Sequence, residues 1–165
     1  MGNNTENGNG AVLTVTKLIT SVIICQLAGF IGAIFTIPAM ETWYQTIKKP
    51  FFNPPDWLFT PVWIFLFLLM GISLFFAWNK RANGESKLLF ITQLILNILW
   101  SVFFFDLKSP GLAFIELIFL WFAIFCTIIS FYRISKIAGL LLLPYIIWVT
   151  FAGVLNYFIW IMNFI

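Results

Sequence analysis

The chain has 165 residues, of which 62% are hydrophobic and 9% charged, and its mean hydropathy of +1.01 is far above that of soluble domains. Its formal net charge of +3 is explained by basic residues beside membrane spans, so we expect no nucleic acid partner. The chain contains no histidine, which excludes imidazole catalysis and haem or metal bound through histidine. It also lacks the motifs of zinc proteases and nucleotide-binding enzymes. We therefore expect no conventional catalytic residues, no metal site and no cofactor.

The N-terminal segment, residues 1–13, begins with a run rich in glycine and asparagine, and we expect it to be a disordered tail. It lacks the basic region of a signal peptide, and the apolar run after it is longer than a signal sequence contains. Residues 14–165 are expected to form a single membrane domain.

Five apolar runs follow, and each is close to the roughly 20 residues that a helix needs to cross the hydrocarbon core of a bilayer. They are Leu18–Ala39, Pro61–Trp78, Leu88–Phe105, Gly111–Tyr132 and Ile137–Met162. Only the first two runs are separated by a long connection, and the five runs leave no room for a soluble domain. We therefore predict an all-α integral membrane protein, a five-transmembrane-helix bundle with a long ordered loop between helices 1 and 2.

The connection between the first two runs combines prolines with large aromatic rings. Proline has no backbone donor and disfavours helix in the residue before it, so residues 43–63 cannot form a continuous helix. Four rings of this segment are amphipathic and typical of a membrane interface: Trp43, Tyr44, Trp57 and Trp63. We predict that the segment forms an ordered lid over the mouth of a structure embedded in lipid.

Basic residues are unevenly divided between the two ends of the predicted helices. Six lie on the side of the N-terminus: Lys17, Lys80, Arg81, Lys87, Arg133 and Lys136. Three lie on the opposite side: Lys48, Lys49 and Lys108. Because cytoplasmic loops carry an excess of lysine and arginine, we expect a cytoplasmic N-terminus, an external lid and location in the cell membrane.

Polar and aromatic residues recur at helical spacing on three of the predicted spans. The faces are Trp63, Phe67, Met70, Gly71 and Leu74 on the second span; Gln93, Asn97, Trp100, Ser101 and Phe104 on the third; and Tyr145, Trp148, Ala152 and Asn156, continued by Asn163, on the fifth. Amides in hydrocarbon need partners, so these faces should point into the bundle. Hydrogen bonding between helices and a ring-lined pocket would each explain one face, and three faces beneath a lid favour the pocket.

Two further features of the spans have a simple structural explanation. Glu116 lies inside the fourth span, where a carboxyl is a functional candidate. Since the spans contain no lysine or arginine to pair with it, we favour a hydrogen-bonded carboxyl that ties the fourth span to a neighbouring helix. Gly29, Gly32 and Ala33 in the first span offer a small-residue surface suited to close helix contact and to homodimer formation.

Three long patterns carry a resemblance to a known family. Residues 43–71 read WYxxxxKPxFxPPxWxFxPVWxxLxxxMG, the third span contains QLxxNxxWSxxFF from Gln93, and the fifth contains LPYxxWVxFAxxLN from Leu143. In order and spacing, these patterns resemble the signatures of the TspO/MBR family, which is the translocator protein or peripheral benzodiazepine receptor family. The resemblance extends from the first span to the C-terminus.

The resemblance implies a five-helix homodimer whose first loop caps a cavity. It also implies binding of porphyrins such as protoporphyrin IX and haem, of sterols in some members, and of synthetic benzodiazepine-site ligands. Position by position, the implied ligand contacts are Trp43, Tyr44, Pro54, Phe59, Trp63, Phe67, Gln93, Asn97, Trp100, Phe104, Trp148, Ala152 and Leu155. A flat tetrapyrrole can stack on tryptophan, while its carboxylates suit lysines or backbone donors near the mouth. Membrane lipid is the other expected partner.

One feature of eukaryotic members is missing. Their sterol-recognition pattern ends in a basic residue, but here no basic residue follows Leu155 and Tyr157. The chain therefore looks more like a bacterial member, and the sequence gives no support for cholesterol as its ligand.

Three classes of function fit the resemblance. The chain is either a receptor or transport protein that binds a porphyrin, or a light-dependent porphyrin-degrading enzyme in which Trp63 and Trp148 take part. A scaffolding subunit with a vestigial pocket is the third. The absence of an acid–base pair and of a cofactor motif favours binding.

Overall fold

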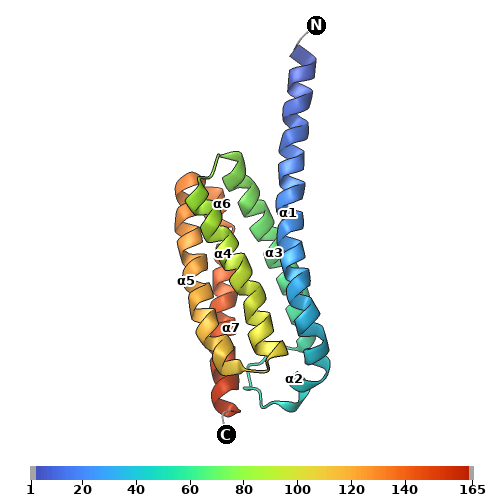
Figure 1. The fold of residues 1–165 in the computed structure, drawn as a ribbon, viewed down its shortest axis with the longest axis vertical. Coiled ribbons are helices and arrows are strands. Elements are labelled where there is room, and N and C mark those ends of the chain that lie inside the picture. The colour runs from blue at the N-terminus through green and yellow to red at the C-terminus, as the bar shows by residue number, and fades with distance from the viewer. Residues whose placement is uncertain (1–2, 164–165) are drawn as a thin grey trace.

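The computed structural model describes residues 3–163, with side chains described from Val12 onward. The chain forms an elongated bundle of helices with its termini at opposite ends (Figure 1). The elements are α1 (Asn3–Glu41), α2 (Trp43–Thr46), α3 (Asp56–Asn79), α4 (Gly84–Ser101), the π-helical turn η1 (Val102–Asp106), α5 (Pro110–Ile134), α6 (Lys136–Leu140) and α7 (Leu143–Met162).

The predicted five-span architecture is confirmed. Within the described part of the chain, five helical segments are long and apolar enough to cross a membrane. They are Val12–Glu41, Asp56–Asn79, Gly84–Asp106, Pro110–Ile134 and Lys136–Met162, and each contains one of the predicted runs. The protein is therefore an integral, multi-pass membrane protein.

Two helix interruptions follow from proline chemistry. Residues 47–55 leave the helical conformation between α2 and α3, and this stretch contains Pro50, Pro54 and Pro55. The last span is divided into α6 and α7, and Pro144 lies in the first turn of α7, where a missing N–H costs nothing. The fifth span is thus interrupted close to its start.

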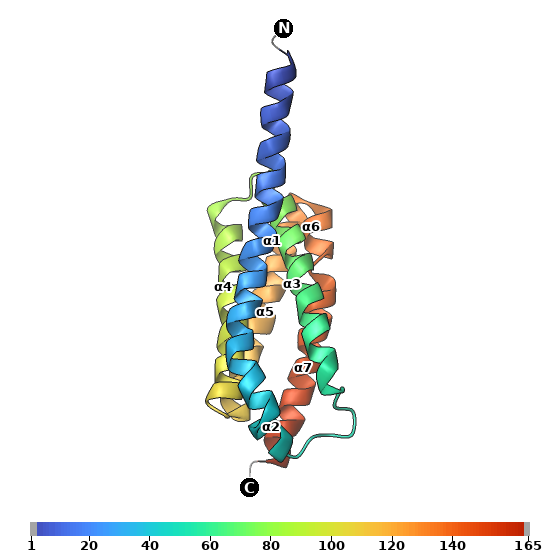
Figure 2. The same ribbon diagram turned by 90° about the vertical axis from the view of Figure 1, so that its right-hand side faces the viewer.

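The start of α1 differs from the prediction. Residues 1–13 were expected to be a disordered tail, but α1 begins at Asn3. Its first turns project beyond the other helices (Figures 1 and 2). Extending a helix needs no new nucleation, so an apolar span can continue into a segment whose glycines and asparagines would not form a helix alone.

The helices pack so that α1 lies at one side of the bundle. It contacts α3, α4 and η1, whereas α5 contacts α4, α6 and α7 (Figure 2). The approach of α1 to α3 depends on Gly71, because a Cβ atom there would lie 2.7 Å from the Cα atom of Val22. The space beside Gly71 is therefore filled by the backbone of α1.

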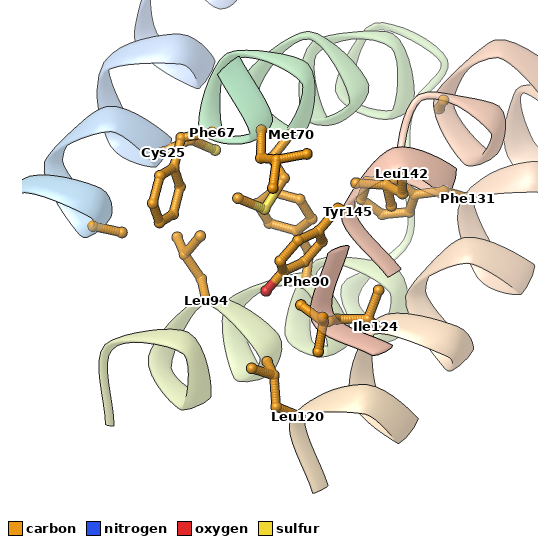
Figure 3. Close-up of a cluster of buried hydrophobic side chains, with 14 of the residues drawn as sticks. Cys25, Phe67, Met70, Phe90, Leu94, Leu120, Ile124, Phe131, Leu142 and Tyr145 are labelled. Atoms are coloured by element: carbon orange, nitrogen blue, oxygen red, sulfur yellow. The ribbon is translucent and has the colours of Figure 1, made fainter. Parts of the chain in front are cut away.

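The core of the bundle is aromatic and aliphatic. Phe90 of α4 stacks on Phe131 of α5 with ring centroids 5.4 Å apart. Figure 3 shows this pair together with Met70 of α3 and Tyr145 of α7, and the Tyr145 side chain is fully buried. Side chains from α3, α4, α5 and α7 thus meet in one cluster, which fixes the relative positions of the helices that border the site.

Candidate ligand-binding site

A cavity of about 620 Å³ lies between α1, α3 and α4. This volume is within the range of about 300–1,000 Å³ that is usual for small-molecule sites. Its lining residues are Ile23, Gln26, Leu27, Gly29, Phe30, Gly32, Ala33, Thr36, Ile37 and Met40 of α1; Phe59, Thr60, Trp63, Ile64 and Phe67 of α3; Asn97, Trp100 and Ser101 of α4; and Phe105 of η1. We call this space the cavity.

Five of the predicted contact residues line the cavity. They are Phe59, Trp63, Phe67, Asn97 and Trp100. Trp63 and Phe67 lie one turn apart on α3, and their ring centroids are 5.7 Å apart. The predicted faces of the second and third spans therefore meet across one space.

A second, much smaller space of about 30 Å³ lies beside the first. The predicted contact residues that border it are Tyr44, Phe59, Trp100, Phe104, Ala152 and Leu155. Because Phe59 and Trp100 border both spaces, they form part of the wall that separates the cavity from the side of α7.

Four predicted contact residues border neither space: Trp43, Pro54, Gln93 and Trp148. Trp43 packs edge-on against Phe104 with centroids 5.6 Å apart, and Trp148 packs against Phe59 with centroids 6.2 Å apart. The buried indole N–H of Trp148 has no hydrogen-bond partner among the described residues.

Helix α1 supplies about half of the cavity wall, although none of the predicted contact residues lies on it. Gln26, Gly29, Ala33, Thr36 and Met40 all line it, and they follow one another at steps of three or four residues. This spacing is a signal of a common helix face that was available in the sequence. It was overlooked because three of the five residues are apolar or lack a side chain.

The small residues of α1 permit the close helix contact predicted for them. A Cβ atom on Gly29 would lie 2.5 Å from the ring of Phe67, and one on Gly32 would lie 3.1 Å from the Ser101 hydroxyl. Gly29 and Gly32 therefore bring α1 close to α3 and α4, and both also line the cavity.

Hydrogen bonds between helices position the polar side chains of the site. The Asn97 amide donates to the Tyr145 hydroxyl at 3.0 Å. The Trp100 indole donates to the Asn156 side-chain oxygen at 3.1 Å, and the Asn156 amide donates to the Pro110 carbonyl at 2.7 Å. The polar faces thus have both of the roles considered for them. They join helices through hydrogen bonds, and some of their residues also line the cavity.

Glu116 departs from its prediction. Its side chain is buried on α5, but neither carboxyl oxygen has a hydrogen-bond partner among the described residues. The expected hydrogen bond to a neighbouring helix is therefore not present. Glu116 also does not line the cavity.

The segment that connects α1 to α3, residues 42–55, is held by side-chain hydrogen bonds. The remainder of the predicted lid, from Asp56 to Trp63, is the start of α3, so from here on the lid means residues 42–55. The Tyr44 hydroxyl donates to Asn53 at 2.7 Å, and the Lys49 ammonium lies 4.0 Å from the centroid of the Tyr44 ring. Burial raises the pKa of Tyr44, the charge of Asp56 raises it further, and the Asn53 hydrogen bond partly offsets both effects. The Tyr44 hydroxyl is therefore neutral and available as a donor at ordinary pH.

The lid is also joined to the C-terminal end of α7. The Lys48 N–H donates to the Asn163 side-chain oxygen at 2.9 Å, and the Asn163 amide donates to the Lys48 carbonyl at 2.9 Å. Asn163 therefore pairs with the lid backbone much as a neighbouring strand would. We call this pair of hydrogen bonds the latch.

The sequence is similar to a known protein family and to several individual proteins. The profile of the TspO/MBR family matches residues 21–161. The Tryptophan-rich protein TspO of Archaeoglobus fulgidus is 43% identical over 153 residues, which cover 92% of this chain and 99% of that protein. The Translocator protein of Homo sapiens is 32% identical over 82% of this chain and 83% of its own. The Tryptophan-rich sensory protein of Cereibacter sphaeroides is 30% identical over 84% and 86%.

Proposed function

Because the chain belongs to the TspO/MBR family, we propose that it is a membrane receptor or sensor that binds a planar hydrophobic ligand of the porphyrin type in the cavity. The names of its relatives, a translocator protein and a tryptophan-rich sensory protein, support a receptor or sensor role. Protoporphyrin IX and haem are the ligands that we propose to test first, and the lid is the proposed cap of the site.

The observation that carries this proposal is the aromatic wall of a cavity large enough for a small molecule. Trp63, Phe67, Phe59, Trp100 and Phe105 all border a space of about 620 Å³. Stacking between aromatic systems contributes about 0.5–1.5 kcal/mol beyond the burial of area, and several rings can act on one large flat ligand. A tetrapyrrole would be held by shape and stacking, since no histidine is present to bind iron.

Binding can be tested by titrating the protein with protoporphyrin IX while its tryptophan fluorescence is followed. Trp63→Phe keeps a ring but removes the larger indole face, and we expect it to weaken binding by roughly two- to tenfold. Trp121→Phe is the matched control, because Trp121 stacks on Phe125 and does not line the cavity. Equal weakening in both variants, or none in Trp63→Phe, would place the ligand outside the cavity.

The latch gives a test of the lid. Asn163→Ala removes both hydrogen bonds to the Lys48 backbone and a third to the Ile159 carbonyl, and Asn163 does not line the cavity. If the lid caps the bound ligand, this change should speed ligand dissociation. An unchanged dissociation rate would contradict the capping role, while leaving the cavity as the binding site.

A light-dependent reaction of the bound porphyrin is the second candidate. Trp63 borders the cavity, whereas Trp148, the other tryptophan proposed for such a reaction, borders neither space. This difference favours binding over a reaction that needs both indoles. Illumination of the complex in air, followed by its absorption spectrum, tests the alternative: loss of the porphyrin bands in the parent but not in Trp63→Phe would support it.

A further inference from the structure

Exposed apolar side chains of two membrane-spanning segments border one side of the cavity. Its outer rim is formed by Leu27 and Phe30 of α1 and by Ile64 of α3, whose side chains are 53%, 66% and 55% exposed. All three lie inside segments that are apolar enough to span a membrane. We call these three residues the rim.

The depth of the rim follows from helix geometry. Ile64 lies eight residues beyond Asp56, the first residue of α3, which corresponds to about 12 Å along the helix. Leu27 lies fourteen residues before Glu41, the last residue of α1, or about 21 Å along that helix. Because the hydrocarbon core is about 30 Å thick, the rim lies within it.

The cavity wall has no charged side chain among the described residues that line it. A charged group placed in such a site at membrane depth would be costly without a partner. Several polar donors of the wall are already used: the Asn97 amide binds Tyr145, the Trp100 indole binds Asn156, and the Thr36 hydroxyl binds the Gly32 carbonyl. The wall therefore suits a molecule with few polar groups and no charge inside the cavity.

One hydrogen bond closes the rim between the two helices. The Gln26 amide donates to the Ile64 carbonyl at 3.1 Å, and both residues line the cavity. Opening the cleft between α1 and α3 for a ligand would break this bond. Gln26 is therefore placed to control passage between lipid and cavity.

From these observations we propose that the ligand is a membrane-dissolved molecule, uncharged where it lies in the cavity, that enters laterally between α1 and α3 past the rim. This inference rests on the proposed function and specifies its ligand class and route. The cavity receives its ligand from the bilayer, and Gln26 acts as a positioning residue that holds the entrance closed.

The test uses the full chain in phosphatidylcholine vesicles and two probes that share one macrocycle and differ in charge: protoporphyrin IX and its uncharged dimethyl ester. The saturable quenching of tryptophan fluorescence is followed by stopped flow. We expect the ester to bind at least as tightly as the diacid, and its loading rate to follow the ratio of probe to lipid. Binding of the diacid more than about tenfold tighter than the ester would overturn the uncharged ligand class.

The route is tested with matched variants. Leu27→Phe/Ile64→Phe adds bulk at the rim, and we expect slower loading by roughly five- to 150-fold, the rate equivalent of overpacking. Ile31→Phe/Leu68→Phe adds the same bulk at lipid-exposed positions of the same helices that do not line the cavity, and should load like the parent. Equal rates in the two double variants would overturn the lateral route.

Gln26 gives a second test of the lateral route, one that adds no bulk at the rim. Gln26→Leu removes the hydrogen bond to Ile64 and should speed loading by about three- to fifteenfold. Thr16→Val is its control, because the Thr16 hydroxyl donates to the Val12 carbonyl within α1 and Thr16 does not line the cavity. An unchanged rate in Gln26→Leu would refute its role at the entrance. Absence of saturable quenching in the parent by either probe would instead refute the proposed function itself.

Discussion

Gly71 lets α3 approach the backbone of α1 at Val22, and replacing Gly71 with alanine tests whether this contact is as tight as the structure indicates. The added methyl carbon would lie 2.7 Å from the Val22 Cα atom. Carbon atoms in ordinary contact are about 3.5–4.0 Å apart, so the two helices would have to separate by about 1 Å. Overpacking of this kind costs about 1–3 kcal/mol, and we expect Gly71→Ala to lower the free energy of unfolding by that amount.

The matched control is Gly84→Ala at the start of α4. A Cβ atom there would meet no other atom within 4 Å, so the same methyl group adds no clash, and alanine favours the helix. Both variants can be unfolded by sodium dodecyl sulfate in mixed micelles and followed by circular dichroism. Equal stability of the two variants would refute the inferred contact between the α1 and α3 backbones.

Four further predictions concern other parts of the molecule. Asn156→Leu breaks the hydrogen bonds to Trp100 and Pro110 and should lower stability by about 1–3 kcal/mol in the same unfolding assay; an unchanged value would contradict it. Glu116→Leu removes a buried carboxyl without a hydrogen-bond partner and should be neutral or stabilising, so a clear loss of stability would indicate a partner. The pKa of Tyr44 is higher in the folded chain than in the unfolded chain. The neutral Tyr44 hydroxyl therefore stabilises the folded state below about pH 10, and this stabilisation is lost as the pH rises further. In an ultraviolet titration, Tyr44→Phe should therefore remove a tyrosine that ionises late, and loss of an early one would contradict the shift. A reporter fused to the C-terminus should lie outside the cytoplasm, and a cytoplasmic reporter in an intact bundle would contradict the predicted orientation.

The expectation of a homodimer comes from the sequence. The dimer was predicted from the family resemblance and from the small residues Gly29, Gly32 and Ala33, which also line the cavity. We propose a homodimer without assigning the helix that mediates it. Measurement of the mass of the protein in several gentle detergents would test it.

The sequence by itself determined the five spans, the break after α1 and the inward direction of the polar faces. Each of these depends on local chemistry. Apolar side chains favour hydrocarbon, proline interrupts a helix, and an amide such as Gln93 or Asn97 must avoid lipid. Both amides are buried in the folded chain, as their spacing along the third span predicts.

Only the tertiary structure decided which helices enclose the cavity. The polar and aromatic faces predict a pocket between the second, third and fifth spans. The cavity lies between α1, α3 and α4, while Ala152 of α7 borders only the smaller space. The missing partner of Glu116 likewise could not be read from one helix. Hydropathy is a property of each segment, whereas the choice of neighbouring helix depends on the fit of side chains, such as Phe67 against Gly29, that are far apart in the sequence.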